Sequence, residues 1–257
     1  MLKKLFQSFR PPVPGPHHRR TTPEVINKSQ HSLQRHQFSR HAVNIVERLQ
    51  SAGYQAYLVG GCVRDLMLGI TPKDFDVATS ATPEQVRAEF RNARVIGRRF
   101  KLVHVHFGRE IIEVATFRAN HPEGDEEENS NLSSRNESGR ILRDNIYGSL
   151  EDDAQRRDFT INALYYDPST ERILDYANGV HDIRNHLIRL IGDPTKRYQE
   201  DPVRMLRAVR FAAKLDFDIE KHSAAPIYKL APMLREIPAA RLFEEVLKLF
   251  LAGYAVY

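Results

Sequence analysis

Two aspartates flank one phenylalanine in the segment PKDFDVATS, residues 72–80, where an apolar strand is predicted to begin. In an extended chain, side chains two residues apart point to the same face, so Asp74 and Asp76 would present two carboxylates together. Two such charges repel each other and resist burial. Either this strand end faces water, with Lys73 nearby, or a cation lies between the two carboxylates.

The segment QAYLVGGCVRDLMLG, residues 55–69, adds a turn that suits phosphate binding. Gly60 and Gly61 end an apolar strand, so the backbone can approach a ligand closely and N–H groups at the following helix start can bind phosphate. The spacing matches neither the P-loop nor the GxGxxG dinucleotide motif. Phosphates beside paired carboxylates call for a divalent metal, so we expect Asp74 and Asp76 to bind two Mg²⁺ ions, with Mn²⁺ as a substitute.

Hydrophobic periodicity predicts that a small mixed α/β domain positions these residues. A helix at HAVNIVERLQSAG precedes the strand and helix around the glycine pair, and the strand KDFDVAT and the helix TPEQVRAEF follow. The segments ARVIGRRFKLVHVHFG and REIIEVATFR alternate in hydrophobicity and are separated by Gly108 and Arg109, which predicts a hairpin or meander.

The second half of the chain is predicted to become helical. The acidic and polar stretch NHPEGDEEENSNLSSRNESGR is expected to be a disordered loop, because it has almost no apolar residues. DAQRRDFTINALYYDP predicts a helix that leads into a strand. From about Ile183 onward helical patterns dominate, and the last one, ARLFEEVLKLFLAGY, has a broad apolar stripe that must pack against something.

Composition sets limits on the class of protein. The net charge of +5 favours a polyanionic partner, and the single cysteine, Cys62, excludes a disulfide framework and favours a reducing compartment, so we expect a cytoplasmic location. No apolar stretch approaches the ~20 residues of a transmembrane helix. The segment MLKKLFQSFRPPVPGPHHRR lacks the apolar region of a secretory signal and is predicted to be a disordered basic arm, with an organellar presequence as the alternative.

Several of these segments, in this order, resemble one family. LVGGCVRDLMLG…PKDFDVAT, EIIEVATFR, EDDAQRRDFTINALYYD and GDPTKRYQEDPVRMLRAVRFAAKL are similar to the class II nucleotidyltransferases of the polymerase β superfamily, the bacterial poly(A) polymerases and the tRNA CCA-adding enzymes. The resemblance implies an α+β fold: a polymerase-β-like nucleotidyltransferase head, with a mixed sheet and flanking helices, followed by an all-α neck. We therefore expect a disordered basic arm at 1–37, the head at 38–180 and an incomplete helical, RNA-binding neck at 181–257.

The resemblance also implies roles for individual residues. Asp74 and Asp76 would be the catalytic, metal-binding carboxylates, and two candidates remain for a third. Asp158, in the RRD motif of QRRDFTINAL, ranks slightly ahead of Glu113, a strand acid that would be costly to bury without a cation. The residues expected to bind nucleotide are Gly60, Gly61, Arg64, Asp65, Arg156, Arg157, Asp201 and Arg204.

The segment EDPVRMLRAVR is implied to select the base in place of a nucleic-acid template. Asp201 and Arg204 are expected near one face of a helix. A carboxylate accepts from the N6 amino group of adenine and a guanidinium donates to N1, whereas guanine reverses that edge pattern. Without the resemblance, the same pair reads as a weak surface ion pair.

The product is expected to be a poly(A) tail. VIGRRFKLVHV, residues 95–105, resembles a stretch that marks the poly(A) polymerases against their CCA-adding relatives. The expected activity is template-independent addition of AMP from ATP to RNA 3′ ends, with RNA-decay or RNA-chaperone proteins as further partners. The alternatives are a CCA-adding enzyme and a non-catalytic RNA-binding remnant. The chain length favours the remnant because the family continues with further helices, whereas the intact Asp74/Asp76 pair and the RRD motif argue against it.

Overall fold

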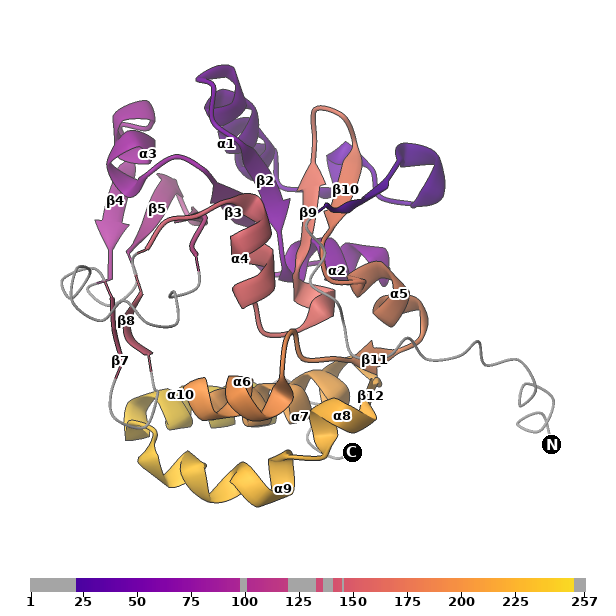
Figure 1. The fold of residues 1–257 in the computed structure, drawn as a ribbon. Coiled ribbons are helices and arrows are strands. Elements are labelled where there is room, and N and C mark those ends of the chain that lie inside the picture. Colours follow the sequence, from indigo (N-terminus) through magenta and orange to yellow (C-terminus); the bar gives the residue numbers. More distant parts are fainter. Residues whose placement is uncertain (1–21, 98–100, 120–132, 136–140, 145, 252–257) are drawn as a thin grey trace.

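The computed structural model describes residues 22–97, 101–119, 133–135, 141–144 and 146–251 (Figure 1). A mixed eight-stranded sheet, in the order β1-β10-β9-β2-β3-β6-β5-β4, is the central element. Its strands are β1 Glu24–Ile26, β2 Ala56–Val59, β3 Asp76–Thr79, β4 Ala93–Ile96, β5 Leu102–Phe107, β6 Glu110–Thr116, β9 Leu164–Asp167 and β10 Arg172–Asp175. Only β3 and β6 pair in parallel within this sheet, and their register sets Asp76 opposite Glu113.

Helices cover the sheet and then form a layer of their own, at the bottom of Figure 1. The helices of the head are α1 Arg40–Ser51, α2 Gly61–Met67, α3 Pro83–Glu89, α4 Leu150–Arg156 and α5 Gly179–Arg184. Those of the helical layer are α6 Pro194–Glu200, α7 Val203–Leu215, α8 Lys221–Ala224, α9 Ile227–Leu230 and α10 Ala239–Leu251. Short 3₁₀ turns lie at η1 Lys28–Gln30, η2 Arg35–Gln37, η3 Thr160–Asn162 and η4 Ala231–Glu236.

The two faces of the sheet bury different residues, as the alternation of side chains along a strand requires. On one face Leu58, Val77 and Val114 join the apolar side of α1 in the main core. On the other face Val59, Ala78 and their neighbours pack under α4, whose Leu150 and Ala154 are buried with them. Asp76 and Glu113 have the parity of this second face, so they lie at the edge of the smaller core rather than inside the main one.

The predicted order of elements from α1 to β6 is confirmed, and so are the α+β class and the helical C-terminal part. The disordered arm is wrong for residues 22–37, because β1 pairs with β10 and Leu33 is buried in the core. Residues 1–21 lie outside the described residues. The first of the two alternating segments forms β4 and β5, and Arg98, Arg99 and Phe100 of its GRRFK stretch also lie outside them.

Two further expectations need correction. The stretch predicted as a disordered loop contains β7, Ser133–Arg135, which pairs with β8, Ile141–Asp144, while 120–132 and 136–140 lie outside the described residues. The neck is not purely helical, since β11, Leu187–Ile188, and β12, Asp218–Ile219, form a short parallel pair. Backbone hydrogen bonding across a close approach of two extended segments outweighed the helical pattern there.

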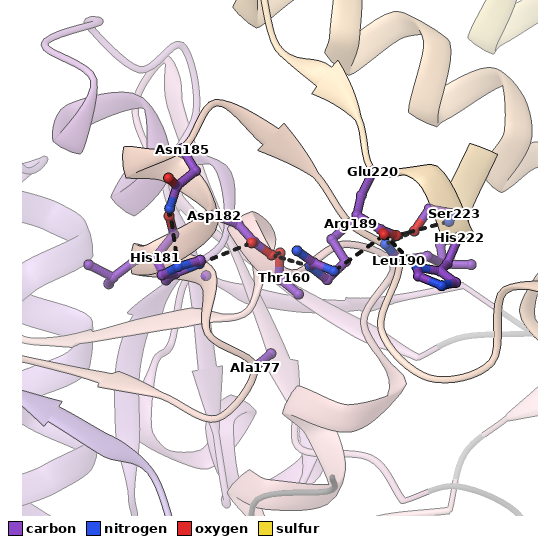
Figure 2. A network of polar contacts seen from close by, with 12 residues as sticks. Thr160, Ala177, His181, Asp182, Asn185, Arg189, Leu190, Glu220, His222 and Ser223 are labelled. Carbon is purple, nitrogen blue, oxygen red and sulfur yellow. Dashed lines mark hydrogen bonds and ion pairs between the residues drawn. The ribbon is translucent and has the colours of Figure 1, made fainter. Parts of the chain in front are cut away.

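A buried polar network fixes the helical layer to the head (Figure 2). Asp182 of α5 accepts from Thr160 Oγ1 at 2.7 Å and from Arg189 Nε at 3.0 Å, and Arg189 also lies 3.6 Å from Glu220. Glu220 in turn caps α8 by accepting from the Ser223 N–H at 3.0 Å. Because these charges are buried in pairs, removal of one partner would leave another uncompensated, so the network makes this junction specific.

Candidate functional site

A cleft of about 390 Å³ opens on the sheet face that carries Asp76 and Glu113. Strands β2, β3, β5 and β6 form its floor, and α4 with the residue that follows it supplies one wall. Its lining residues are Val59, Asp76, Val77, Leu102, Glu113, Ala115, Thr116, Arg118, Asp153, Arg156 and Arg157. Three carboxylates and three guanidinium groups therefore meet in one concave site, which suits a substrate that carries phosphates and a divalent cation.

Asp76 and Glu113 face the cleft from adjacent parallel strands. Burial first, and then the charge of Glu113, raise the pKa of Asp76 to about 6, although the nearby Arg157 guanidinium opposes both effects. His104, opposite Glu113 on β5, brings its Nε2 to 3.6 Å from the Glu113 carboxylate. The raised pKa reflects burial of the Asp76 carboxylate and, next, its repulsion by Glu113, and a bound cation would offset both effects.

Asp74 has a different setting from its partner. It lies just before β3 rather than in it, is exposed, and is not part of the cleft lining. Its charge is a smaller contribution to the raised pKa of Asp76 than that of Glu113. The acid beside Asp76 within the sheet is therefore Glu113, while Asp74 lies just before the N-terminal end of β3.

Arg157 is held in place on the cleft wall. Its guanidinium donates to Asp153 Oδ2 at 3.1 and 2.9 Å and to the Tyr165 hydroxyl at 2.9 Å, and Tyr165 also donates to Asp153 at 2.8 Å. The guanidinium is thus pre-organised, so little side-chain entropy is lost when an anion binds.

Gly60 and Gly61 form the turn that the sequence predicted. Gly60 has φ +77° and ψ −127°, a conformation that is strained for residues with a side chain, and it is the N-cap of α2. A Cβ on Gly60 would lie 3.5 Å from Arg157 Nη1, so the turn and the cleft wall are neighbours.

Arg64 and Asp65, predicted to bind nucleotide, are buried away from the cleft. Arg64 donates to Asp65 at 2.8 and 2.6 Å and to Asn162 Oδ1, and its guanidinium lies 4.9 Å from the centre of the Phe211 ring on α7. Asp65 also pairs with Lys214 of α7 at 3.2 Å. The structure thus places both side chains at the contact between α2 and α7.

Asp158 does not join Asp76 and Glu113. Its carboxylate accepts four hydrogen bonds: from the Phe159 N–H at 2.8 Å, from Asn162 Nδ2 at 3.0 Å and from Arg207 at 2.8 and 2.6 Å. A carboxylate offers about four acceptor positions, so all of them are used. Burial alone would raise the pKa of Asp158, but the Arg207 charge and these hydrogen bonds hold it well below its usual range. The structure therefore places Glu113, and not Asp158, beside Asp76.

Asp201 and Arg204 lie on either side of the break between α6 and α7. The prediction of a shared helix is wrong for Asp201, which is the C-cap of α6 because Pro202 interrupts the hydrogen bonding. Arg204 donates to the Arg197 carbonyl at 2.6 Å and lies 3.2 Å from Glu200, while Asp201 Oδ2 pairs with Arg241 at 2.7 Å. Within the described residues, the buried Asp201 Oδ1 has no hydrogen-bond partner.

The residues present suit a hard divalent cation. Asp76, Glu113 and Asp74 offer oxygen ligands only, the donor type that Mg²⁺ prefers. Among the described residues, no three His, Cys, Asp or Glu side chains are grouped closely enough to hold a metal ion without help. This fits Mg²⁺, which is commonly held by one or two carboxylates together with substrate phosphates.

Sequence reasoning missed three residues at this site. Arg118 and Asp153 line the cleft, and Arg197 of α6 donates to the carbonyl oxygens of Arg156 and Arg157, the latter at 2.9 Å. Arg118 directly follows the strand pattern EIIEVATF, and Asp153 precedes Arg157 by one helical turn. These spacings could have indicated Arg118 and Asp153. No local pattern could have indicated Arg197, because its partners lie about 40 positions earlier in the chain.

Among the described residues, no helix is both long and apolar enough to cross a membrane.

Two family models match the chain. One, described as "Poly A polymerase head domain", matches residues 56–189, and the other, "Probable RNA and SrmB- binding site of polymerase A", matches residues 216–257. The first covers the cleft and every strand of the eight-stranded sheet except β1, and the second begins directly after α7 and covers the helices α8, α9 and α10.

Relatives with known names are similar over most of the chain. Poly(A) polymerase I of Haemophilus influenzae is 56% identical over 93% of this chain and 52% of its own length. Poly(A) polymerase I of Salmonella typhimurium is 58% identical over 89% of this chain and 49% of its own length. The CCA-adding enzyme of Lactobacillus helveticus is 38% identical over 81% of this chain and 49% of its own. The chain spans about half the length of the curated relatives it matches.

Solved structures share the fold. The CCA-adding enzyme of Bacillus stearothermophilus in complex with CTP has 37% sequence identity and a TM-score of 0.68, over 81% of this chain and 47% of that one. A tRNA nucleotidyltransferase complexed with a primer tRNA and an incoming ATP analog has 27% identity and a TM-score of 0.60, over 82% of this chain and 60% of that one.

Proposed function

Because the chain belongs to the family of the poly A polymerase head domain, we propose that it adds AMP from ATP to RNA 3′ ends without a template and releases pyrophosphate. The cleft that joins Asp76, Glu113 and three arginines is the observation that carries this proposal. The higher identity to relatives named poly(A) polymerase I than to CCA-adding enzymes supports the poly(A) branch.

The residues of the cleft would have different roles in nucleotidyl transfer. Asp76 and Glu113 would hold Mg²⁺, together with Asp74 just before β3. The metal would stabilise charge on the reacting phosphate and hydroxyl oxygens. Arg156, Arg157 and Arg118 would bind the triphosphate through charge-assisted hydrogen bonds. Gly60 and Gly61 leave the backbone open to the nucleotide beside Arg157. We propose Glu113, and not Asp158, as the third carboxylate, because the acceptor positions of Asp158 are already filled.

Asp201 and Arg204 would select the base. The buried and unpaired Asp201 Oδ1 is an acceptor that an adenine amino group can satisfy. Arg204 is fixed by Arg197 and Glu200 through Nη1, which leaves its other N–H groups to meet an adenine ring nitrogen. Guanine would present its donors and acceptors in the reverse order and leave both protein groups unsatisfied.

One extension assay tests the proposal. A radiolabelled single-stranded RNA, and separately a tRNA that lacks its 3′ CCA, is incubated with Mg²⁺ and with ATP, CTP or both nucleotides. We expect ATP-dependent extension of both RNAs and little incorporation from CTP. Completion of one C-C-A end on the tRNA alone would move the chain to the CCA-adding branch. No incorporation by a folded chain that also fails to bind ATP would identify it as an RNA-binding remnant.

RNA 3′ ends and ATP are the proposed substrates, with Mg²⁺ and, as a substitute, Mn²⁺ as the metal. RNA-decay or RNA-chaperone proteins stay a prediction, and so does the cytoplasmic location expected from the single cysteine.

A further inference from the structure

Helices α6 and α7 hold the segment from Arg156 to Asp158 at two separate points. From α6, Arg197 donates to the carbonyl oxygens of Arg156 and Arg157. From α7, Arg207 donates through Nε and Nη2 to Asp158 Oδ2, at 2.8 and 2.6 Å. Because both helices contact the same three consecutive residues, the orientation of α6 and α7 relative to this segment is fixed. A single contact would allow the helices to rotate about it.

The same two helices carry the proposed base-selecting residues. Asp201 ends α6, and Arg204 lies in the first turn of α7, three residues before Arg207. Residues three apart on a helix lie on the same side, one turn from each other. Arg197 lies on α6. A rotation of α7 relative to α6 would therefore move Arg204 relative to the triphosphate arginines, Arg156 and Arg157.

The contact between Asp158 and Arg207 is built to resist such a rotation. The Asp158 side chain is only 12% exposed, and the guanidinium meets one carboxylate oxygen through two N–H groups. Arg207 Nη1 also lies 3.5 Å from Glu245 of α10, and its guanidinium is 5.4 Å from the centre of the Phe211 ring. The flat guanidinium is thus held on three sides, a geometry that a lysine ammonium cannot reproduce.

We propose that Arg207 is a positioning residue for base selection: through Asp158 it sets where Asp201 and Arg204 stand relative to the triphosphate arginines, and so sets the preference for ATP over GTP. The inference rests on the proposed function. Arg207 itself does not touch the nucleotide, since its N–H groups are directed to Asp158 and Glu245. The triphosphate contacts tolerate a small shift better than the base edge does, because hydrogen bonds to a base need close alignment whereas charges act over longer distances.

The experiment measures equilibrium binding of ATP·Mg²⁺ and GTP·Mg²⁺ to the full 257-residue chain, with thermal melting of each variant. Arg207→Lys keeps the positive charge but removes the two guanidinium N–H groups that donate to Asp158. Asp158→Asn changes the acceptor in the same contact, because it removes the negative charge. We expect each to lower the ATP-to-GTP affinity ratio about 10-fold, mainly by weakening ATP binding. The double variant should lose little more than either single one, because both changes break one contact.

Arg210→Lys is the matched control. Arg210 lies on the same helix, 4.5 Å from the centre of the Phe211 ring, and it pairs with Glu245 at 3.1 Å. It makes no hydrogen bond to Asp158, so the affinity ratio should stay within about 2-fold of that of the wild type.

The outcomes separate this inference from the proposed function. Wild type that prefers ATP, with the preference lost in Arg207→Lys and Asp158→Asn but kept in Arg210→Lys, supports the positioning role. Wild type that prefers ATP, with the preference kept in Arg207→Lys, overturns it and leaves the proposed function intact. An equal loss in Arg207→Lys and Arg210→Lys overturns it too, because the effect is then general. Wild type that binds both nucleotides equally removes the base selection that the proposed function includes, and this inference with it.

Discussion

Asp76 combines burial with a like charge on the neighbouring strand, and this combination gives it a raised pKa. At pH 7 the carboxylate is ionised against that tendency, so without a metal it destabilises the folded chain. A function that uses the charge explains why the arrangement exists.

We predict that Asp76→Asn and Glu113→Gln lower nucleotide transfer at least about 100-fold, because each removes a ligand for Mg²⁺. The melting temperature of Asp76→Asn at pH 7 with a chelator should equal or exceed that of the wild type, because the change relieves repulsion. Transfer rates and calorimetry on the same samples measure both quantities. A variant that keeps more than about a tenth of the wild-type rate would contradict the assignment of that carboxylate.

Asp201 offers a second test at the residue scale, because one of its oxygens is buried without a partner. We predict that Asp201→Asn lowers the preference for ATP over GTP about 10-fold, since an amide can present either a donor or an acceptor to the base. Competition between the two nucleotides in one extension reaction measures the ratio. An unchanged ratio with a slower rate would assign Asp201 to the structure of the α6–α7 junction alone.

Close packing of backbone segments determines how the elements meet around α5. A Cβ on Gly179 would overlap the carbonyl oxygen of Thr160 and lie 2.9 Å from its carbonyl carbon. The N–H of Gly179 also donates to the fully buried Asp175 carboxylate at 3.0 Å. Neither backbone group can yield easily, so the position requires glycine.

We predict that Gly179→Ala destabilises the chain by about 2 kcal/mol or more, through displacement of α5 from η3. Gly61→Ala is the control for stability, because its Cβ would meet only Arg64 Nη2 at an ordinary 3.5 Å, and we expect a change within about 0.5 kcal/mol. Urea unfolding of both variants gives the comparison. Equal stabilities for the two would mean that α5 can shift at no cost.

The network of Figure 2 predicts a pH dependence at the element scale. Burial opposes ionisation of Glu220, but hydrogen bonds from His222 and Ser223 and the Arg189 charge lower its pKa to about 2. A lowered folded-state pKa gives stability that is complete above the unfolded value, about 4.5, and is lost as the pH falls toward 2. Glu220→Gln should therefore melt below the wild type at pH 7, with a smaller difference at pH 3. A constant difference at both values would show that the charge of Glu220 is not what stabilises the junction.

The whole molecule exposes an apolar face on α10. Phe243 is 60% exposed and Phe250 is 63% exposed, although the sequence predicted a stripe that packs against other residues. The side of α10 that carries Glu245 is the one that faces α7, where Arg210 pairs with it. Phe243 and Phe250 therefore contribute little to the stability of the described fold.

We predict that Phe243→Ser combined with Phe250→Ser leaves the melting temperature within about 2 °C of the wild type and reduces self-association. Differential scanning fluorimetry and sedimentation velocity measure the two effects. A clear fall in melting temperature would show that this face is covered in solution.

Local patterns were enough to predict the elements of the fold. Helical spacing in HAVNIVERLQSAG and the strand–glycine–helix order around Gly60 depend on neighbours in the chain, so the sequence alone determined them. The expectation that Asp76 stands at a strand end in a phosphate-binding setting has the same origin.

Only the tertiary structure decided which distant residues meet. Glu113 became the partner of Asp76 because β6 inserts in parallel beside β3, a pairing between strands that are not consecutive. Asp158 pairs with Arg207, 49 positions later, because charge-assisted hydrogen bonds from a guanidinium stabilise a buried carboxylate more than neutral donors do. Arg64 and Asp65 became part of the contact with α7 for the same reason. Spacing along the chain encodes the elements, whereas the partner of a charge is set by packing, which no local pattern records.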